Sequence, residues 1–258
     1  MDIALLISTY NWPKALHMVL STVQNQTVLP NEILIADDGS TEDTKKVIEE
    51  WKEKLTIPIK HLWHEDKGFR KTIIMNKAIA SSSSNYIVQI DGDILLEKHF
   101  IQDHIKNAKK GFFIKGSRAL ILKDRTESIL NNQIFVLKEE LKYVKNTINA
   151  TRMPLFASIF RKDKFKSNNV KGCNFAFWKK DFIAVNGYDN DMDGWGHEDI
   201  ELAARLTNLG IKQRQLKMVA ICFHLHHKFN DRGNENINYS KYLDVVKNGV
   251  VRCKNGFN

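Results

Sequence analysis

Four short apolar runs alternate with amphipathic segments over the first ninety residues. The runs are typical of buried strands and lie at Ile3–Ile7, Glu32–Ala36, Ile57–Trp63 and Tyr86–Ile90. Between them, the spacing of apolar positions predicts helices at Pro13–Gln24, Thr41–Lys54 and Lys71–Ala80. This alternation favours a mostly parallel sheet with helices on both faces.

The pattern is less regular in the rest of the chain. A helix is expected over 97–110 and a strand over Phe112–Ile121, whereas the Lys-rich stretch 123–171 predicts no clear element. Further elements follow as a strand at Cys173–Trp178, a helix at His197–Leu209 that stops before Gly210, and a strand at Gln213–Phe223. We therefore expect an α/β fold, with residues 1–258 as one domain whose halves are 1–120 and 121–258.

Composition narrows the choice of partner. With 258 residues, 43% of them hydrophobic, the chain can bury a full core. Its 39 Lys and Arg against 30 Asp and Glu give a net charge of +9, which favours an anionic partner such as a nucleotide, a phosphorylated glycan or a lipid headgroup. No RNA- or DNA-binding motif is recognisable, so no nucleic acid is expected as a partner.

Cysteine spacing and hydropathy bear on the compartment. The three cysteines lie far apart without a CxxC pair, which favours plain thiols in a reducing compartment. The N-terminus lacks the basic region of a signal peptide, and no apolar run approaches the roughly 18 residues of a membrane span. The expected location is cytoplasmic, at most peripheral on the inner face of the membrane.

Acidic residues follow two of the predicted strands. Asp91 and Asp93 flank Gly92 after the fourth strand, and Asp37 and Asp38 end the second. Open α/β sheets bind ligands at this edge. The first pair can hold a hard divalent cation together with diphosphate oxygens, and the second can accept the imide N–H of uracil. Ordinary Asp-Gly turns are the alternative for both pairs.

Two further acids open the predicted helix after Trp195 and Gly196. Glu198 and Asp199 lie in its first turn, where the helix dipole stabilises carboxylates as anions that remain available as bases. Simple helix capping is the alternative.

Several blocks together resemble a known family. Ile7–Asn11, Ala36–Ser40 and Asp91–Asp93, in this order and spacing, resemble the nucleotide-binding half of family 2 glycosyltransferases of the GT-A type. Gly187–Asp189 followed by Gly194–Asp199 is similar to the acceptor segment of β1,4-galactosyltransferases and bacterial chondroitin polymerase domains. The resemblance covers roughly residues 3–120 and 171–228.

The resemblance implies a Rossmann-like GT-A fold with a smaller acceptor-side lobe. It also implies an inverting enzyme that moves a sugar from a UDP-sugar to a glycan or lipid-linked saccharide in bacterial surface polysaccharide synthesis. Residues 1–120 would bind the nucleotide sugar and residues 121–258 the acceptor. Asp199 would be the catalytic base, with Glu198, Trp195 and Gly196 holding the acceptor. His197 replaces a glycine common in this pattern, so donor and acceptor identity do not transfer.

The same resemblance suggests the metal and donor ligands. Mn²⁺, or Mg²⁺, would be bound by Asp91, Asp93 and His224, with His226 as second choice for the histidine and His227 left open. The donor-binding residues would be Thr9, Asp37, Asp38, Arg70, Asp91, Gly92 and Asn174. Thr9 would contact the base or ribose and Arg70 the region of the phosphates. Asn174 would contact a sugar hydroxyl or simply pack at a strand edge.

Other interpretations stay open. A sugar nucleotidyltransferase would also place acids on such a sheet, although the Gly-rich basic phosphate loop of those enzymes is absent at the N-terminus. A non-catalytic nucleic-acid- or sugar-binding module is a further alternative. Within Arg152–Lys171, phenylalanines alternate with basic residues, which suits an anionic membrane surface, a lipid-linked acceptor or a solvated basic loop.

Overall fold

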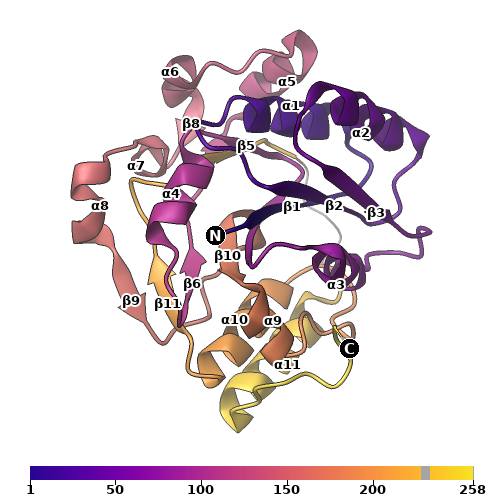
Figure 1. Cartoon of the computed structure of the whole chain (residues 1–258), viewed down its shortest axis with the longest axis vertical. Coiled ribbons are helices and arrows are strands. Elements are labelled where there is room, and N and C mark those ends of the chain that lie inside the picture. The colour runs from indigo at the N-terminus through magenta and orange to yellow at the C-terminus, as the bar shows by residue number, and fades with distance from the viewer. Residues whose placement is uncertain (228–232, 258) are drawn as a thin grey trace.

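A large mixed sheet forms the centre of the molecule (Figure 1). The computed structural model describes residues 1–227 and 233–257. Eight strands run in the order β3-β2-β1-β4-β10-β6-β11-β9. They span β1 Ile3–Thr9, β2 Glu32–Asp37, β3 Ile59–Trp63, β4 Tyr86–Asp91, β6 Phe112–Lys115, β9 Lys162–Lys164, β10 Phe175–Trp178 and β11 Lys212–Gln215.

Helices cover both faces of this sheet, as the sequence predicts (Figure 1). The longer ones are α1 Pro13–Gln24, α2 Glu42–Lys54, α3 Lys71–Ser81, α4 Phe100–Asn107, α5 Lys123–Asn132, α10 Glu198–Asn208 and α11 Glu235–Asn248. The shorter ones are α6 Leu137–Glu140, α7 Thr147–Ala150, α8 Pro154–Phe160 and α9 Lys179–Ala184, with 3₁₀ turns η1 Leu141–Tyr143 and η2 Gly172–Asn174. None of the described helices is both long enough and apolar enough to cross a bilayer.

Alternate residues of β1 build two separate cores. Leu5 packs in a cluster with side chains of α1 and α2, whereas Leu6 packs in a second cluster with α3 and α10. Successive side chains of a strand point to opposite faces, so a strand buried on both sides must be apolar throughout. All seven residues of β1 are buried, which explains its uninterrupted apolar run.

The strand register brings the polar strand ends together. In the parallel pairings, Thr9 lies opposite Asp37 and Ser8 lies opposite Asp91. The blocks singled out in the sequence therefore meet at one edge of the sheet.

A second, four-stranded sheet adds a histidine to this edge. It has the order β5-β12-β7-β8, with β5 Ile94–Leu96, β12 Cys222–His224, β7 Ala119–Ile121 and β8 Val144–Lys145. In the antiparallel pairing of β5 with β12, His224 lies opposite Ile94. Since Ile94 directly follows Asp93, the register places His224 beside that acid.

Two predicted strands are each divided between the two sheets. Phe112–Ile121 contains β6 and β7, and 213–223 contains parts of β11 and β12. The first run breaks at Gly116, where an added Cβ would lie 2.1 Å from the Asn174 side chain. The second breaks where Met218 and Ala220 take positive φ angles of 61° and 50°, which a continuous strand cannot contain.

The sheet is less uniformly parallel than its first half suggests. β10 runs antiparallel to both β4 and β6, and β9 runs antiparallel to β11. Residues 123–171, for which no element is predicted, contain four helices, two short strands and η1.

Candidate active site

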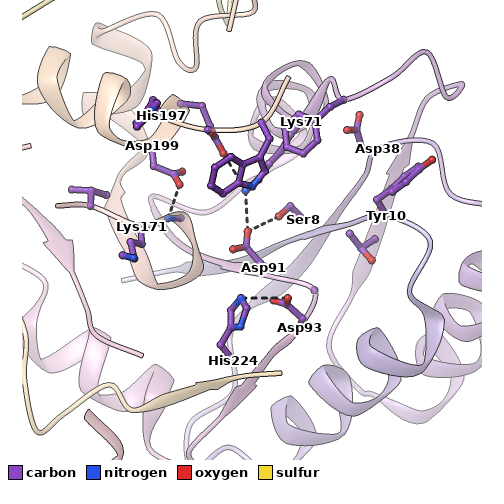
Figure 2. A pocket seen from close by; sticks show the side chains of 18 of the residues that line it. Ser8, Tyr10, Asp38, Lys71, Asp91, Asp93, Lys171, His197, Asp199 and His224 are labelled. Carbon is purple, nitrogen blue, oxygen red and sulfur yellow. Dashed lines mark hydrogen bonds and ion pairs between the residues drawn. The ribbon is translucent and has the colours of Figure 1, made fainter. Parts of the chain in front are cut away.

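A pocket of about 900 Å³ opens at the edge where the polar strand ends meet. Figure 2 shows that side chains from β1, β4, the start of α3, the start of α10 and β12 face one another there. Ten of the predicted site residues line it, namely Thr9, Asp38, Asp91, Gly92, Asp93, Trp195, Gly196, Glu198, Asp199 and His224. Asp37, Arg70 and Asn174 are not among its described lining residues.

Asp91 is held by a hydroxyl and an ammonium group. Ser8 Oγ donates to Asp91 Oδ1 at 3.0 Å, and Lys71 Nζ lies 2.9 Å from the same oxygen. Burial by itself would raise the pKa of Asp91, but the Lys71 charge outweighs it and the pKa is lowered. Asp91 is therefore an anion with a cationic partner.

Lys71 joins the two halves of the site. It is the first residue of α3, and its Nζ also lies 3.5 Å from Glu198 Oε1 at the start of α10. Burial opposes its charge, but Asp91 and Glu198 raise its pKa well above the ordinary value. Arg70, and not Lys71, was the residue of this segment predicted to bind the donor. The sequence signal that points to Lys71 is its position at the start of a predicted helix, between the segments that carry Asp38 and Asp91.

Asp199 accepts hydrogen bonds from three residues. The Gly172 amide donates to Oδ2 at 2.7 Å, and the Tyr188 hydroxyl and Gln89 Nε2 donate to Oδ1 at 3.2 and 3.4 Å. Burial, and then the charge of Glu198, raise the pKa of Asp199 to about 7. A carboxyl group with this pKa can take up a proton near neutral pH.

The approach to Asp199 requires a glycine. A Cβ at Gly172 would lie 2.5 and 2.7 Å from the two carboxylate oxygens of Asp199. Any other residue at position 172 would displace either the carboxylate or the 3₁₀ turn η2. The contact between Gly172 and Asp199 was not predicted, because the two residues are 27 positions apart.

Asp93, His224 and His227 form a cluster that could hold a metal ion. Their ligand atoms all lie within 4.8 Å of one another. Asp93 Oδ2 is 3.5 Å from His224 Nε2 and 3.3 Å from His227 Nε2. Within the described part of the chain, the buried Asp93 Oδ1 has no hydrogen-bond partner. Burial lowers the pKa of His224 to about 4, so its imidazole is neutral and able to bind a metal.

This cluster differs from the predicted ligand set in two ways. His227 takes the place considered for His226, which is exposed and whose backbone N–H donates to Thr126 Oγ1 at 2.9 Å. Asp91 is not in the cluster, because its carboxylate faces Lys71 and Ser8 (Figure 2). Burial and the nearby Asp91 charge raise the pKa of Asp93 to about 7.

The two acids at the end of β2 have different surroundings. Asp37 is 1% exposed, accepts a hydrogen bond from the Ser40 amide at 2.8 Å and contacts His61 Nε2 at 2.9 Å. It therefore stabilises the turn that follows β2. Asp38 lines the pocket, with His64 Nε2 at 2.6 Å and the Arg70 amide donating at 3.0 Å. Burial raises the pKa of Asp38.

Arg70 and Asn174 are engaged elsewhere. The Arg70 guanidinium donates to the Glu65 carbonyl, and only the Arg70 backbone reaches Asp38. Asn174 is 1% exposed and its Nδ2 donates to the carbonyls of Ser117 and Ala220 at 2.9 and 3.0 Å. Asn174 thus ties together the segments between the two sheets, in line with the packing alternative.

Two family models match the chain. Glycosyl transferase family 2 matches residues 4–182, and the model described as the N-terminal domain of galactosyltransferase matches residues 155–228. The second match contains the Trp195–Asp199 segment and the three histidines. The two matched ranges together contain every residue of the pocket described above except Tyr239.

Curated relatives are about one-quarter identical to this chain over the regions that match. Chondroitin synthase of Escherichia coli is 26% identical over 83% of this chain and 33% of its own length. Hyaluronan synthase of Pasteurella multocida is 26% identical over 81% of this chain and 23% of its own. Validoxylamine A glucosyltransferase of Streptomyces hygroscopicus subsp. limoneus is 27% identical over 81% and 48%. The chain thus spans between a quarter and half of these proteins.

Solved structures share the fold. The mannosyltransferase PcManGT of Pyrobaculum calidifontis, in complex with GDP-Man and Mn²⁺, has a TM-score of 0.60 at 16% identity and covers 94% of this chain and 61% of its own. TarS 1-349 of S. aureus in complex with UDP has a TM-score of 0.64 at 12% identity, covering 98% and 67%. The GT-A fold expected from the sequence is confirmed.

Proposed function

Because this chain belongs to glycosyl transferase family 2, we propose that it is an inverting, metal-dependent transferase that moves a sugar from a UDP-sugar to a saccharide acceptor. One observation carries the proposal. A single pocket contains the Asp93–His224–His227 cluster on one side and the Asp199 carboxylate, with its pKa near 7, on the other. Such a pocket can hold a nucleotide diphosphate and a nucleophile together.

The nucleotide would lie along the ends of β1 and β2. Thr9 and Asp38 line this part of the pocket, and Asp37 holds the turn that carries Asp38. Gly92 allows the backbone after β4 to lie close to Thr9, since a Cβ at this position would be 3.0 Å from Thr9 Oγ1. Asp38 or the neighbouring backbone amides would form hydrogen bonds with the edge of the nucleobase.

The metal-binding part suits a divalent cation of intermediate softness. One carboxylate and two imidazoles favour Mn²⁺ over Mg²⁺, which prefers oxygen ligands. The unpartnered Asp93 Oδ1 provides a further ligand atom. When bound, the metal would neutralise charge on the departing diphosphate. Asp91 lies at the end of β4 and is paired with Lys71. From there it would orient the part of the donor that binds the metal.

Asp199 would remove the proton from the acceptor hydroxyl. The proton moves to a carboxylate oxygen as the acceptor oxygen attacks the anomeric carbon on the face opposite the diphosphate, which leaves with the bonding electrons. A β linkage then forms from an α-linked donor. Glu198 and Trp195, which flank the same pocket, would position the acceptor.

An exposed apolar region supports association with an anionic membrane or a lipid-linked acceptor. Large apolar side chains gather on and around α8, among them Ile148, Met153, Leu155, Phe156, Ile159, Phe160 and Phe165, with Leu155 90% exposed. Arg161, Lys162, Lys164 and Lys166 follow directly. Apolar groups flanked by cations suit the boundary of an anionic bilayer.

Flotation with phosphatidylglycerol vesicles tests this association. Binding should fall for Leu155→Ser with Ile159→Ser, and equal flotation of that variant contradicts the idea.

A thermal-shift screen tests the main proposal. UDP-sugars and GDP-mannose are added with Mn²⁺ or with EDTA, because a ligand that binds only the folded state raises Tm by mass action. At a hundredfold excess over Kd, about 2.7 kcal/mol should raise Tm by roughly 5 °C or more. UDP release from the stabilising donor is then measured with candidate acceptors. A Tm shift with GDP-mannose alone would replace uracil by guanine as the nucleobase of the donor. Pyrophosphate release from UTP would support a nucleotidyltransferase instead.

A further inference from the structure

A second cavity, of about 170 Å³, lies beside the main pocket and is called the side pocket here. Its lining includes Lys115, Arg118 and Lys171, two asparagines and Cys173, and no Asp or Glu among the described residues. Arg118 and Lys171 also line the main pocket, so they stand between the two cavities. The side pocket is thus a cationic extension of a pocket that is otherwise rich in acids.

Within the part of the chain that the structure describes, the three cations lack close counter-ions. Throughout residues 1–227 and 233–257, no carboxylate lies within 4.0 Å of Lys115, Arg118 or Lys171. Arg118 Nη1 instead donates to Cys173 Sγ at 3.1 Å. That thiol is neutral, because burial raises its pKa to about 11. Burial and the charges of Lys217 and Lys171 lower the pKa of Lys115.

Three other arginines that are at least partly buried have carboxylate partners. Arg205 pairs with Glu201 at 2.6 Å, Arg152 with Asp103 at 2.7 Å, and Arg214 with Asp163 at 2.7 Å. Taking a charge out of water without a counter-ion is unfavourable. Among the described residues, the partly buried Lys115 and Arg118 of the side pocket have no such partner, and a bound anion would balance their charge.

The side pocket also lies close to the reacting groups. Lys171 precedes Gly172, whose amide donates to Asp199 (Figure 2). Arg118 is close enough to Asp91 and Asp93 for their charges to raise its pKa. A sugar placed between the metal-binding cluster and Asp199 would have its substituents directed toward these two cations.

We propose that the side pocket binds the anionic group, a carboxylate or a phosphate, of an acidic sugar that reacts in the main pocket. The inference rests on the proposed function and narrows its substrate class to saccharides that carry a negative charge beyond the nucleotide. Charge-assisted hydrogen bonds from Lys115, Arg118 and Lys171 would hold the anion. The acidic sugar is either the one transferred or the one that accepts it, and both carry the same chemistry.

Titration calorimetry with matched acidic and neutral sugars tests the proposal. The donor arm compares UDP-glucuronic acid with UDP-glucose in the presence of Mn²⁺. The acceptor arm adds glucuronate- or glucose-terminated disaccharides, and glucose 6-phosphate or glucose, to the UDP–Mn²⁺ complex. In one arm the acidic member should bind the wild-type protein about tenfold more tightly or better. That arm identifies which sugar carries the anion.

Lys115→Gln is the diagnostic variant, because Lys115 lines only the side pocket. It should reduce the preference for the acidic member to below about threefold while leaving UDP–Mn²⁺ affinity unchanged. Lys110→Gln, at an exposed position outside both cavities, should retain the full preference.

Equal affinity for acidic and neutral sugars in both arms overturns the proposal, as does a preference that Lys115→Gln leaves intact. The UDP–Mn²⁺ titration reports separately on the proposed function, since that complex does not depend on the side pocket. Failure of UDP to bind would therefore reject the proposed UDP-sugar donor, whereas failure of the acidic preference alone would reject only the side-pocket ligand.

Discussion

Asp199 links the pH dependence of the proposed reaction to its burial. Its pKa is raised to about 7 by burial and by Glu198, and only the ionised form can accept a proton. The rate of transfer should therefore rise with pH through about 7 and fall about tenfold at one pH unit below the pKa. A pH–rate profile of kcat/KM for the wild-type protein measures this. A flat profile between pH 5.5 and 8 would contradict the role of Asp199.

The same shift affects stability. Because the folded-state pKa lies above the unfolded value of about 3.9, Asp199 favours the folded state below that value, and this contribution is lost as pH rises toward about 7. Asp199→Asn should therefore unfold at a higher urea concentration than wild type at pH 8, and without this advantage at pH 4. The variant should still bind UDP and Mn²⁺ but not transfer. An unchanged urea midpoint at pH 8 would show that burial of the ionised Asp199 side chain does not destabilise the folded state.

Gly172 offers a test of how closely the base is held. In Gly172→Ala the added methyl group would meet both oxygens of Asp199. A displacement of about 1 Å should lower kcat by about a hundredfold. UDP–Mn²⁺ affinity, measured in parallel, should remain within about threefold of wild type, because the nearest contacts of the methyl group are with Asp199 and Gln89. Unchanged kcat would show that the geometry at Asp199 is not important for transfer.

At the scale of elements, the start of α3 sets the charge balance between β4 and α10. Lys71 lies between Asp91 and Glu198, and its charge lowers the pKa of Asp199. Lys71→Gln should therefore shift the midpoint of the pH–rate profile to a value above that of wild type. Lys77→Gln, exposed on the same helix, should leave the midpoint in place. A midpoint that moves downward in Lys71→Gln would contradict this account.

A buried ion pair fixes the loop between α9 and α10. Arg205, fully buried, pairs with Glu201 and donates to the carbonyls of Val185 and Gly187 at 2.6 and 2.7 Å. Arg205→Met leaves Glu201 buried without a partner and should lower the free energy of unfolding by about 3–5 kcal/mol. The double variant with Glu201→Leu should recover much of this loss in urea unfolding. A loss below about 1 kcal/mol in the single variant would contradict the structural role.

At the scale of the whole molecule, the first half was predictable because its signals are local. The apolar run of β1 and the acids that end β2 and β4 are read directly from neighbouring residues, and parallel pairing brings them to one edge. Trp195, Gly196, Glu198 and Asp199 were selected by resemblance to a known pattern, and all four line the pocket.

The parts that sequence did not predict depend on contacts between distant segments. Lys71 reaches Glu198 across 127 positions, and Gly172 reaches Asp199 across 27. The division of Phe112–Ile121 between two sheets depends on Gly116 lying against Asn174. The choice of His227 over His226 depends on which imidazole turns toward Asp93 after β12 ends. No local pattern encodes these arrangements.

The central claim is that the Asp93–His224–His227 cluster makes nucleotide binding metal-dependent. Calorimetric titration of UDP with Mn²⁺ or with EDTA tests it most directly, in wild type, His227→Ala and His226→Ala. We predict that Mn²⁺ raises UDP affinity by about tenfold or more in wild type and His226→Ala, and that His227→Ala loses this gain. Equal affinity with Mn²⁺ and EDTA in wild type, or loss of the gain in His226→Ala but not in His227→Ala, would contradict the claim.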